Sequence, residues 1–374
     1  MNDVLPSDAS DATPYREVNY EFSKDFLPIL QHLKASLLIS TYQAGKVAVV
    51  GQHNGELVLS LHNFEKAMGI AVGDRRIAIG AKGIIWLLED ASDLASRIEP
   101  VGRYDGLYLV RKSFVTGNIH GHEMAWSGDQ LWVVNTLFSC LCTLHEDFSY
   151  VPRWRPPFVT ELVAEDRCHL NGLAMLDEQP KYVTVMAESN QAGGWRESKA
   201  TTGCVLDVPS GEVVARGFAM PHSPRIHNDQ LWVLDSGNGK LCTVDQSSGK
   251  VETVAVVPGY TRGLAFAGQF AFVGMSKIRE TSVFGGLPIA ENPLQLRCGV
   301  AVIDLSTGQA AAFIQFNTGV EEVFDVQFLH TATTPTLRGP YPDLDATQAV
   351  WMVPRSDQVS VVSSMPNRNP FRRS

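Results

Sequence analysis

Short apolar segments recur along the whole chain, separated by turns rich in Gly, Asn, Asp and Ser. Segments of this kind predict β-strands joined by tight connections. The pattern also repeats itself: Leu37–Val47 aligns without a gap on Leu231–Leu241, and Gln130–Asn135 aligns on Gln230–Asp235. A repeat of roughly 40 to 55 residues built from short strands is typical of a β-propeller. The pattern therefore predicts an all-β, single-domain propeller.

The number of blades follows from counting equivalent strands. Seven segments fit the second strand of a repeat: Leu37–Thr41, Ile77–Gly80, Leu131–Asn135, Tyr182–Ala187, Leu231–Asp235, Phe270–Met275 and Val350–Pro354. Six fit the first strand: Gly69–Val72, Glu123–Trp126, Gly172–Met175, Ser223–His227, Gly263–Phe266 and Phe324–Phe328. We expect seven blades, and six remain open if the two ends of the chain share one blade.

The ends of the chain are expected to pair and to close the ring, because an unpaired edge strand invites aggregation. Residues 26–33 look helical, and Tyr20–Phe22 could supply a strand to the last blade. We expect a disordered polar segment over residues 1–18, the propeller over 19–364 and a flexible basic tail over 365–374.

Composition indicates which classes of partner and which cellular compartment to expect. The 374 residues have a formal net charge of −9, which argues against nucleic acid. The first residues lack the apolar core of a secretory signal, and no run approaches the roughly 20 apolar residues of a membrane span. We therefore expect a cytoplasmic protein with no membrane partner, whose six cysteines are reduced and buried.

In a propeller, the starts of the first strands and the loops after the second strands share one rim, around the mouth of the central channel. His122 and His222 are equivalent in the repeat, and His169 begins the blade between them. Three imidazoles on rigid strands could bind one divalent transition metal, which is the candidate cofactor. Glu123 or Glu322 would then be the general base.

The same rim is rich in cations. Arg225, Arg262 and Arg196 could receive a carboxylate or phosphate, together with Lys277 and Arg279. The alternative is that some of them pair with neighbouring glutamates. His120 and Asn171 also lie at this rim as candidate ligand contacts, and Trp195, which follows two glycines, could act as a movable flap or as a packing residue.

Several motifs together resemble one family. They are LISTYQAGK (38–46), HEMAW (122–126), HLNGLA (169–174), MPHSPR (220–225) and SKIRE (276–280). The chain is similar to a bacterial family of uncharacterised proteins thought to be β-propellers, without an established activity. The resemblance implies the fold and implies that these motifs are the family's signature. It assigns no catalytic role to any residue.

Two functions remain open. The first is binding of a small, anionic ligand at the channel mouth, with transformation of that ligand by a histidine-bound metal. The second is a non-catalytic platform that docks a protein or peptide on the rim loops, which would need an exposed aromatic patch. The rim offers few aromatic side chains (Tyr42, Phe138, Trp195 and Phe284), which favours the small ligand.

Overall fold

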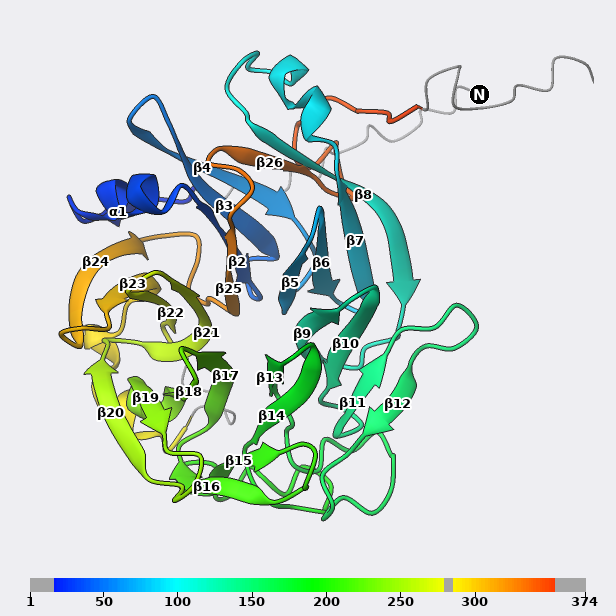
Figure 1. The fold of residues 1–374 in the computed structure, drawn as a ribbon, viewed down its shortest axis with the longest axis vertical. Coiled ribbons are helices and arrows are strands. Elements are labelled where there is room, and N and C mark those ends of the chain that lie inside the picture. The colour runs from blue at the N-terminus through cyan, green and yellow to red at the C-terminus, as the bar shows by residue number, and fades with distance from the viewer. Residues whose placement is uncertain (1–16, 279–284, 354–374) are drawn as a thin grey trace, which may run out of the picture.

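The apolar segments form six β-sheets arranged as blades around a central axis (Figure 1). The computed structural model describes residues 17–278 and 285–353. Strands are given from the axis outwards. Blade I contains β25 (Asp325–Leu329), β2 (Ser36–Thr41), β3 (Lys46–His53) and β4 (Glu56–Asn63), and blade II contains β5 (Ile70–Gly73), β6 (Arg76–Ala81), β7 (Ile84–Asp90), β8 (Gly106–Val115) and β26 (Pro335–Arg338). Blade III contains β9 (Gly121–Ser127), β10 (Gln130–Asn135), β11 (Cys140–Thr143) and β12 (Val151–Trp154).

The other three blades follow in the same sense around the ring. Blade IV contains β13 (Gly172–Leu176), β14 (Gln179–Val185), β15 (Gly203–Asp207) and β16 (Val213–Phe218), and blade V contains β17 (Pro221–His227), β18 (Gln230–Asp235), β19 (Lys240–Val244) and β20 (Val251–Val256). Blade VI contains β21 (Tyr260–Ala267), β22 (Phe270–Ser276), β23 (Cys298–Asp304), β24 (Gln309–Phe316) and, outermost, β1 (Tyr20–Phe22).

The structure has six blades, which is the alternative that the sequence left open, and not the preferred seven. The expected seventh second strand, Val350–Pro354, is not a strand over Val350–Val353, and Pro354 lies outside the described residues. Phe324–Phe328, the last of the six expected first strands, corresponds to β25 and pairs with β2 of blade I instead of preceding a strand at Val350–Pro354. The expected pairing of the chain's ends is confirmed, because one blade combines strands from both ends and so closes the ring with a hydrogen-bonded ladder.

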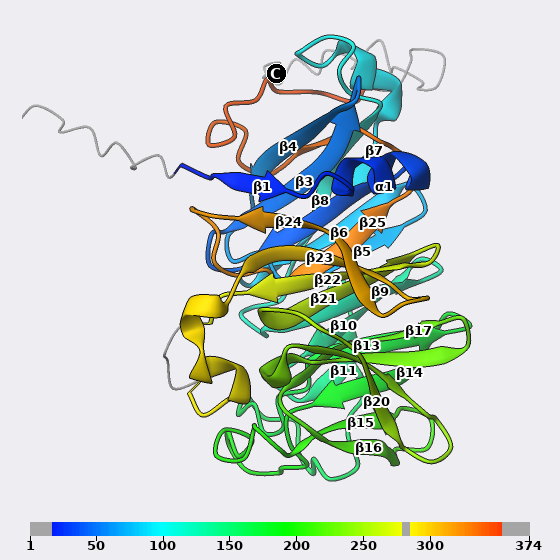
Figure 2. The ribbon, with the colours of Figure 1, turned by 90° about the vertical axis from the view of Figure 1, so that its left-hand side faces the viewer.

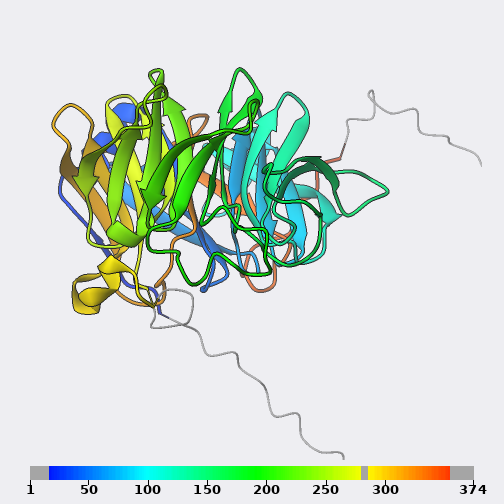
Figure 3. The same cartoon turned by 90° about the horizontal axis from the view of Figure 1, so that it is seen from below.

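The remaining segments cover the outside and one rim. The expected helix is α1 (Phe26–Leu33), and β1 pairs with β24 as an outermost strand (Figure 2). Short helical turns are η1 (Ser92–Arg97), η2 (Ser236–Asn238), η3 (Pro288–Glu291) and η4 (Pro293–Gln295); η3 and η4 project from one rim in yellow (Figure 3). No helix within residues 17–278 and 285–353 is long and apolar enough to cross a membrane.

The core consists of apolar clusters between neighbouring blades. Consecutive residues of one strand point into different clusters: Val133 packs towards blade II and Val134 towards blade IV. The same holds for Leu37 and Leu38, on the two sides of blade I. A strand covered on both faces must be apolar at every position. This explains why the second strands read as continuous apolar runs rather than as alternating patterns.

The inner strands crowd together at the axis, and glycine is required there. Gly263 in β21 has φ +83°, and a Cβ atom on it would lie 2.6 Å from the backbone nitrogen of Val326 in β25. A Cβ atom on Gly69 would lie 2.6 Å from the carbonyl oxygen of His122. The glycines that head several first strands thus permit the close contact that positions the channel residues.

Candidate functional site at the channel mouth

A pocket of about 340 Å³ opens at the predicted rim. Its walls come from the loops after β2, β4 and β22, the start of β21 and the segment before β25. The lining residues are Tyr42, Gln43, Lys66, Tyr260, Arg262, Ser276, Lys277, Ile278, Glu321 and Glu322. Three cations therefore face two carboxylates in a protein whose overall charge is −9. This mouth pocket is locally cationic.

Arg262 forms the inner wall of the mouth pocket. Its guanidinium pairs with Glu322 and lies over the ring of Phe324, 4.1 Å from the centroid. The ion pair is held by little exposed side chains, at 9% for Arg262 and 21% for Glu322. Glu322, the predicted base, is thus engaged by a cation, and Arg262 carries less free positive charge than its position suggests.

Lys66 and Lys277 differ from Arg262, which forms an ion pair with Glu322. Within the part of the chain that the structure describes, no ion pair joins either lysine to a carboxylate. Lys66 is exposed and lies 5.6 Å from the ring centroid of Tyr42, whereas Lys277 is half-buried. These two ammonium groups are the cations that a ligand in the mouth pocket can neutralise.

Arg262 also lines a second cavity, of about 10 Å³, which is large enough for about one water molecule. The lining residues of this axial cavity are His122, Glu123, Asn171, His222, Ser223, Arg262, Phe324 and Asp325. Five of the predicted site residues therefore meet here, from blades III, IV, V and VI. Asp325 of blade I was not predicted.

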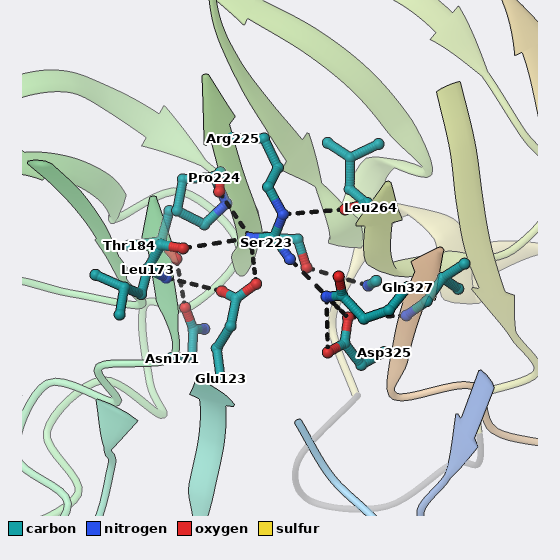
Figure 4. Close-up of polar contacts among 12 residues, drawn as sticks. Glu123, Asn171, Leu173, Thr184, Ser223, Pro224, Arg225, Leu264, Asp325 and Gln327 are labelled. Atoms are coloured by element: carbon teal, nitrogen blue, oxygen red, sulfur yellow. Dashed lines mark hydrogen bonds and ion pairs between the residues drawn. The ribbon is translucent and has the colours of Figure 1, made fainter. Parts of the chain in front are cut away.

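Glu123 and Asp325 flank the guanidinium of Arg225 (Figure 4). Arg225 pairs with Glu123 and lies 4.0 Å from Oδ1 of Asp325. Both carboxylates also accept backbone N–H groups of the next blade: Glu123 from Leu173 at 2.7 Å and Asp325 from Ile70 at 2.8 Å. Ser223 does the same for Gly263 of blade VI at 3.1 Å. These side chains connect inner strands from blade to blade.

Two buried carboxyls, of Glu123 and Asp325, share the guanidinium of Arg225; we refer to these three residues as the axial cluster. Burial raises the pKa of Glu123 to about 7, although Arg225 opposes the rise. Burial likewise raises the pKa of Asp325, again against Arg225. Arg225 also donates to the carbonyl oxygens of Leu264 at 3.0 Å and Pro224 at 2.8 Å. The predicted ligand contact Arg225 and the predicted base Glu123 are therefore bound to each other and to the scaffold.

His122 and His222 adopt the same local structure, as the repeat predicted. Nδ1 of His122 lies 2.9 Å from the carbonyl oxygen of His120, and Nδ1 of His222 lies 3.0 Å from that of Met220. A carbonyl only accepts, so Nδ1 carries the proton and Nε2 is the unprotonated nitrogen of each ring. Burial lowers the pKa of both imidazoles well below the usual range. Both rings at the axial cavity are neutral.

His169 occupies a different position from the one predicted. The residues with positive φ two places before the channel side chains include His120, His169 and Met220, so Asn171 is the counterpart of His122 and His222. Asn171 lines the axial cavity and His169 does not. Nδ1 of His169 instead lies 2.9 Å from Oδ2 of Asp166, a residue that the sequence did not single out.

Trp195 is a packing residue and not an open flap in this structure. Its side chain is 1% exposed, its ring lies 4.3 Å from that of His169, and its Nε1 donates to Asp166 at 3.1 Å. It packs in one apolar cluster with Tyr260 and Leu287. The loop after β14, which holds Trp195, and the loop after β22, which holds Leu287, therefore meet on this side of the mouth.

The other predicted contacts lie at the edge of the site. Arg196 is half-exposed, stacks on Trp195 at 4.7 Å and lies 3.8 Å from Asp166. His120 is half-buried, and its Nε2 lies 3.2 Å from the amide of Asn118. Arg279 lies outside the described residues. Neither Arg196 nor His120 lines the mouth pocket or the axial cavity.

The proposed metal ligands do not form a compact set. Within residues 17–278 and 285–353, no three His, Cys, Asp or Glu side chains are grouped so that they could hold a metal ion. The rings of His122 and His169 are 4.9 Å apart and edge-on. Metal binding by His122, His169 and His222 stays a prediction.

The molecule is a six-bladed β-propeller with a cationic pocket that borders a buried polar cluster at Arg262. Its sequence matches the family model described as a domain of unknown function, DUF4915, over residues 24–337. The chain belongs to this family, which agrees with the resemblance noted from the motifs. No curated protein matches the sequence.

Solved structures are similar in fold alone. A protein of unknown function from Bacteroides caccae has a TM-score of 0.50 at 9% identity, covering 79% of this chain and 99% of its own. A chain from a nidogen/laminin complex has a TM-score of 0.47 at 11% identity, covering 79% and 98%. Virginiamycin B lyase from Staphylococcus aureus has a TM-score of 0.39 at 14% identity, covering 63% and 71%.

Proposed function

We propose that the protein binds a small acidic molecule in the mouth pocket, with its carboxylate or phosphate group held by Lys66, Lys277 and Arg262. The observation that supports this is the excess of cations in a pocket of about 340 Å³ on an otherwise acidic protein. That volume lies within the range of roughly 300–1,000 Å³ of small-molecule sites.

The alternative platform function has less support. Among the described residues, the rim aromatics Tyr42 and Phe138 are half-buried and Trp195 is buried. Phe284 lies outside the described residues. A docking surface for a protein or peptide needs exposed apolar side chains, which these three residues do not supply. A small ligand fits the observed rim better.

The test is a titration of small mono- and dicarboxylates and sugar phosphates, followed by isothermal calorimetry. We expect at least one acid to bind, and the double variant Lys66→Met/Lys277→Met to lose about tenfold or more in affinity, since charge-assisted hydrogen bonds contribute roughly 1.5–3 kcal/mol. Lys250→Met is the matched control, because Lys250 pairs with Glu252 on the exposed strand β20. Equal affinity of the double variant and the wild type would disprove this proposal.

The metal is a separate part of the proposed function and has its own test. A divalent ion on His122 and His222 would require their unprotonated Nε2 atoms, which the tautomers leave available. Elemental analysis of the purified protein should show about one equivalent of a transition metal, lost in His122→Ala/His222→Ala. Absence of metal after incubation with iron, manganese and zinc would disprove the metal site, and acid binding alone would remain as the proposed function.

A further inference from the structure

A second pocket, of about 290 Å³, lies between the outermost strands of blades I and II, away from the channel. Figure 1 shows β26 beside β3 and β4, and these strands are in contact. The pocket residues that matter here are His62 of β4, Arg338 of β26, and Asp345 and Thr347 of the following loop. We refer to this as the wall pocket.

Buried polar atoms without partners concentrate in the wall pocket. Twelve buried side-chain nitrogen and oxygen atoms of the described residues lack a hydrogen bond, and four belong to this one pocket. They are Nδ1 of His62, Nε of Arg338, Oδ2 of Asp345 and Oγ1 of Thr347. Buried polar groups are almost always hydrogen-bonded, so four such atoms in one pocket point to a polar ligand as their partner.

Arg338 presents the edge of its guanidinium that suits a carboxylate. Nη1 already donates to Oγ1 of Thr336 and to the carbonyl oxygen of Leu337, both at 3.0 Å. The edge formed by Nε and Nη2 remains, and within residues 17–278 and 285–353 no carboxylate lies within ion-pair distance of it. Two parallel N–H groups on one edge bind a carboxylate in a bidentate manner.

Asp345 presents a negative group in the same pocket. Its Oδ1 accepts from the backbone N–H of Asn63 at 2.8 Å and from the side-chain amide of Asn63 at 2.6 Å. Its Oδ2 is buried and has no partner among the described residues. An ionised carboxylate oxygen accepts only, so the occupant must offer a donor at this end.

His62 supplies a neutral wall between these groups. Its side chain is 3% exposed, and its Nε2 lies 2.9 Å from Oγ of Ser60. Burial, followed by the nearby charges of Arg338 and Lys46, lowers the pKa of His62 to about 3. A neutral ring adds hydrogen bonding without charge, so the charged side chains that line the wall pocket are Arg338 on one hand and Asp345 and the exposed Glu99 on the other.

We propose that the wall pocket binds a free amino acid, with its carboxylate on Nε and Nη2 of Arg338 and its ammonium on Oδ2 of Asp345. A cation that faces carboxylates selects a zwitterion over a simple anion, and about 290 Å³ leaves room for a single small molecule. This site is independent of the acid-binding function proposed for the mouth pocket.

Thermal unfolding tests the proposal with free amino acids, their N-acetyl derivatives and their amides. Because a ligand that binds the folded state raises Tm by mass action, we expect at least one free amino acid to raise Tm in a concentration-dependent way. Its N-acetyl derivative lacks the ammonium and its amide lacks the carboxylate, so neither should do so. Solvent water alone as the occupant predicts no shift from any of these compounds and overturns the proposal.

Variants assign the effect to the wall pocket. Arg338→Gln and Asp345→Asn should each weaken binding of that amino acid by about tenfold or more, and Asp345→Asn remains informative if Arg338→Gln fails to fold. Arg111→Gln, at an exposed position of β8, is the control and should bind normally. The variant Lys66→Met/Lys277→Met should also bind the amino acid normally. If this variant lost binding while Asp345→Asn kept it, the amino acid would bind in the mouth pocket and the wall-pocket proposal would be wrong.

Discussion

The axial cluster and the mouth pocket meet at Arg262, yet their charged residues have different surroundings. In the axial cluster, Arg225, Glu123 and Asp325 pair with one another and bind backbone groups of neighbouring blades. The axial cavity, which Glu123 and Asp325 line, measures about 10 Å³, against about 340 Å³ for the mouth pocket. In the mouth pocket, Lys66 and Lys277 have no carboxylate within ion-pair distance among the described residues.

This difference separates charges that support the fold from charges that can receive a ligand. A buried ion pair contributes to specificity and is costly to break, but its groups are already occupied. A partly exposed cation without a partner retains its capacity to bind. Arg262 stands between the two regions, since it lines both cavities and pairs with Glu322.

The largest expected effect is that of Arg225→Met. Removing the guanidinium leaves two buried carboxyls without a cation, so the free energy of unfolding should fall by about 3–5 kcal/mol. Urea denaturation at neutral pH measures the change. Arg196→Met is the control, because the guanidinium of Arg196 is half-exposed. A loss below about 1 kcal/mol would show that the axial cluster does not stabilise the fold in this way.

The next effect is on the pH dependence of stability. The pKa of Glu123 rises from 4.5 when unfolded to about 7 when folded, so the folded state binds the proton more tightly between these values. Stability should therefore fall as pH rises from 4.5 to about 7. In Glu123→Gln this fall should become shallower. Unfolding in urea across this pH range compares the two slopes, and identical slopes would refute the assignment to Glu123.

The smallest effect concerns the boundary between the two regions. Glu322→Gln removes the charge that engages Arg262, so the mouth pocket gains a free cation. We expect the affinity for a small acid to increase by about threefold to fivefold, equivalent to roughly 1 kcal/mol, because the acid then takes the place of the Glu322 carboxylate on Arg262. Calorimetric titration of the same acid provides the measurement. Weaker binding by Glu322→Gln would instead identify Glu322 as a ligand contact.

The strands were predictable because their physical cause is local. Each second strand is covered on both faces, so an apolar run such as Leu231–Asp235 identifies it without knowledge of its neighbours. The blade count was not predictable in the same way. Whether β25 begins a new blade or completes the one that contains β2 depends on ring closure, which joins residues almost 300 positions apart.

The site was predicted in part for the same reason. The equivalence of His122 and His222 follows from the repeat and is confirmed by their matching hydrogen bonds. His169 was misplaced because its positive φ moves Asn171, two residues later, into the channel position. The sequence analysis did not single out Asp325, because it did not place the strand of Asp325 in blade I. A signal was present, since Asp325 follows the aromatic Phe324 as Glu123 follows His122.

The closure of blade I has a consequence for synthesis. Strands β2, β3 and β4 leave the ribosome early, but their innermost partner β25 emerges only after residue 329 has been made. Until then blade I lacks the strand that lines the axis, and Ile70 lacks the carboxylate of Asp325. The nascent chain must therefore hold an incomplete first blade until β25 has been made, and the ring can close only after that point.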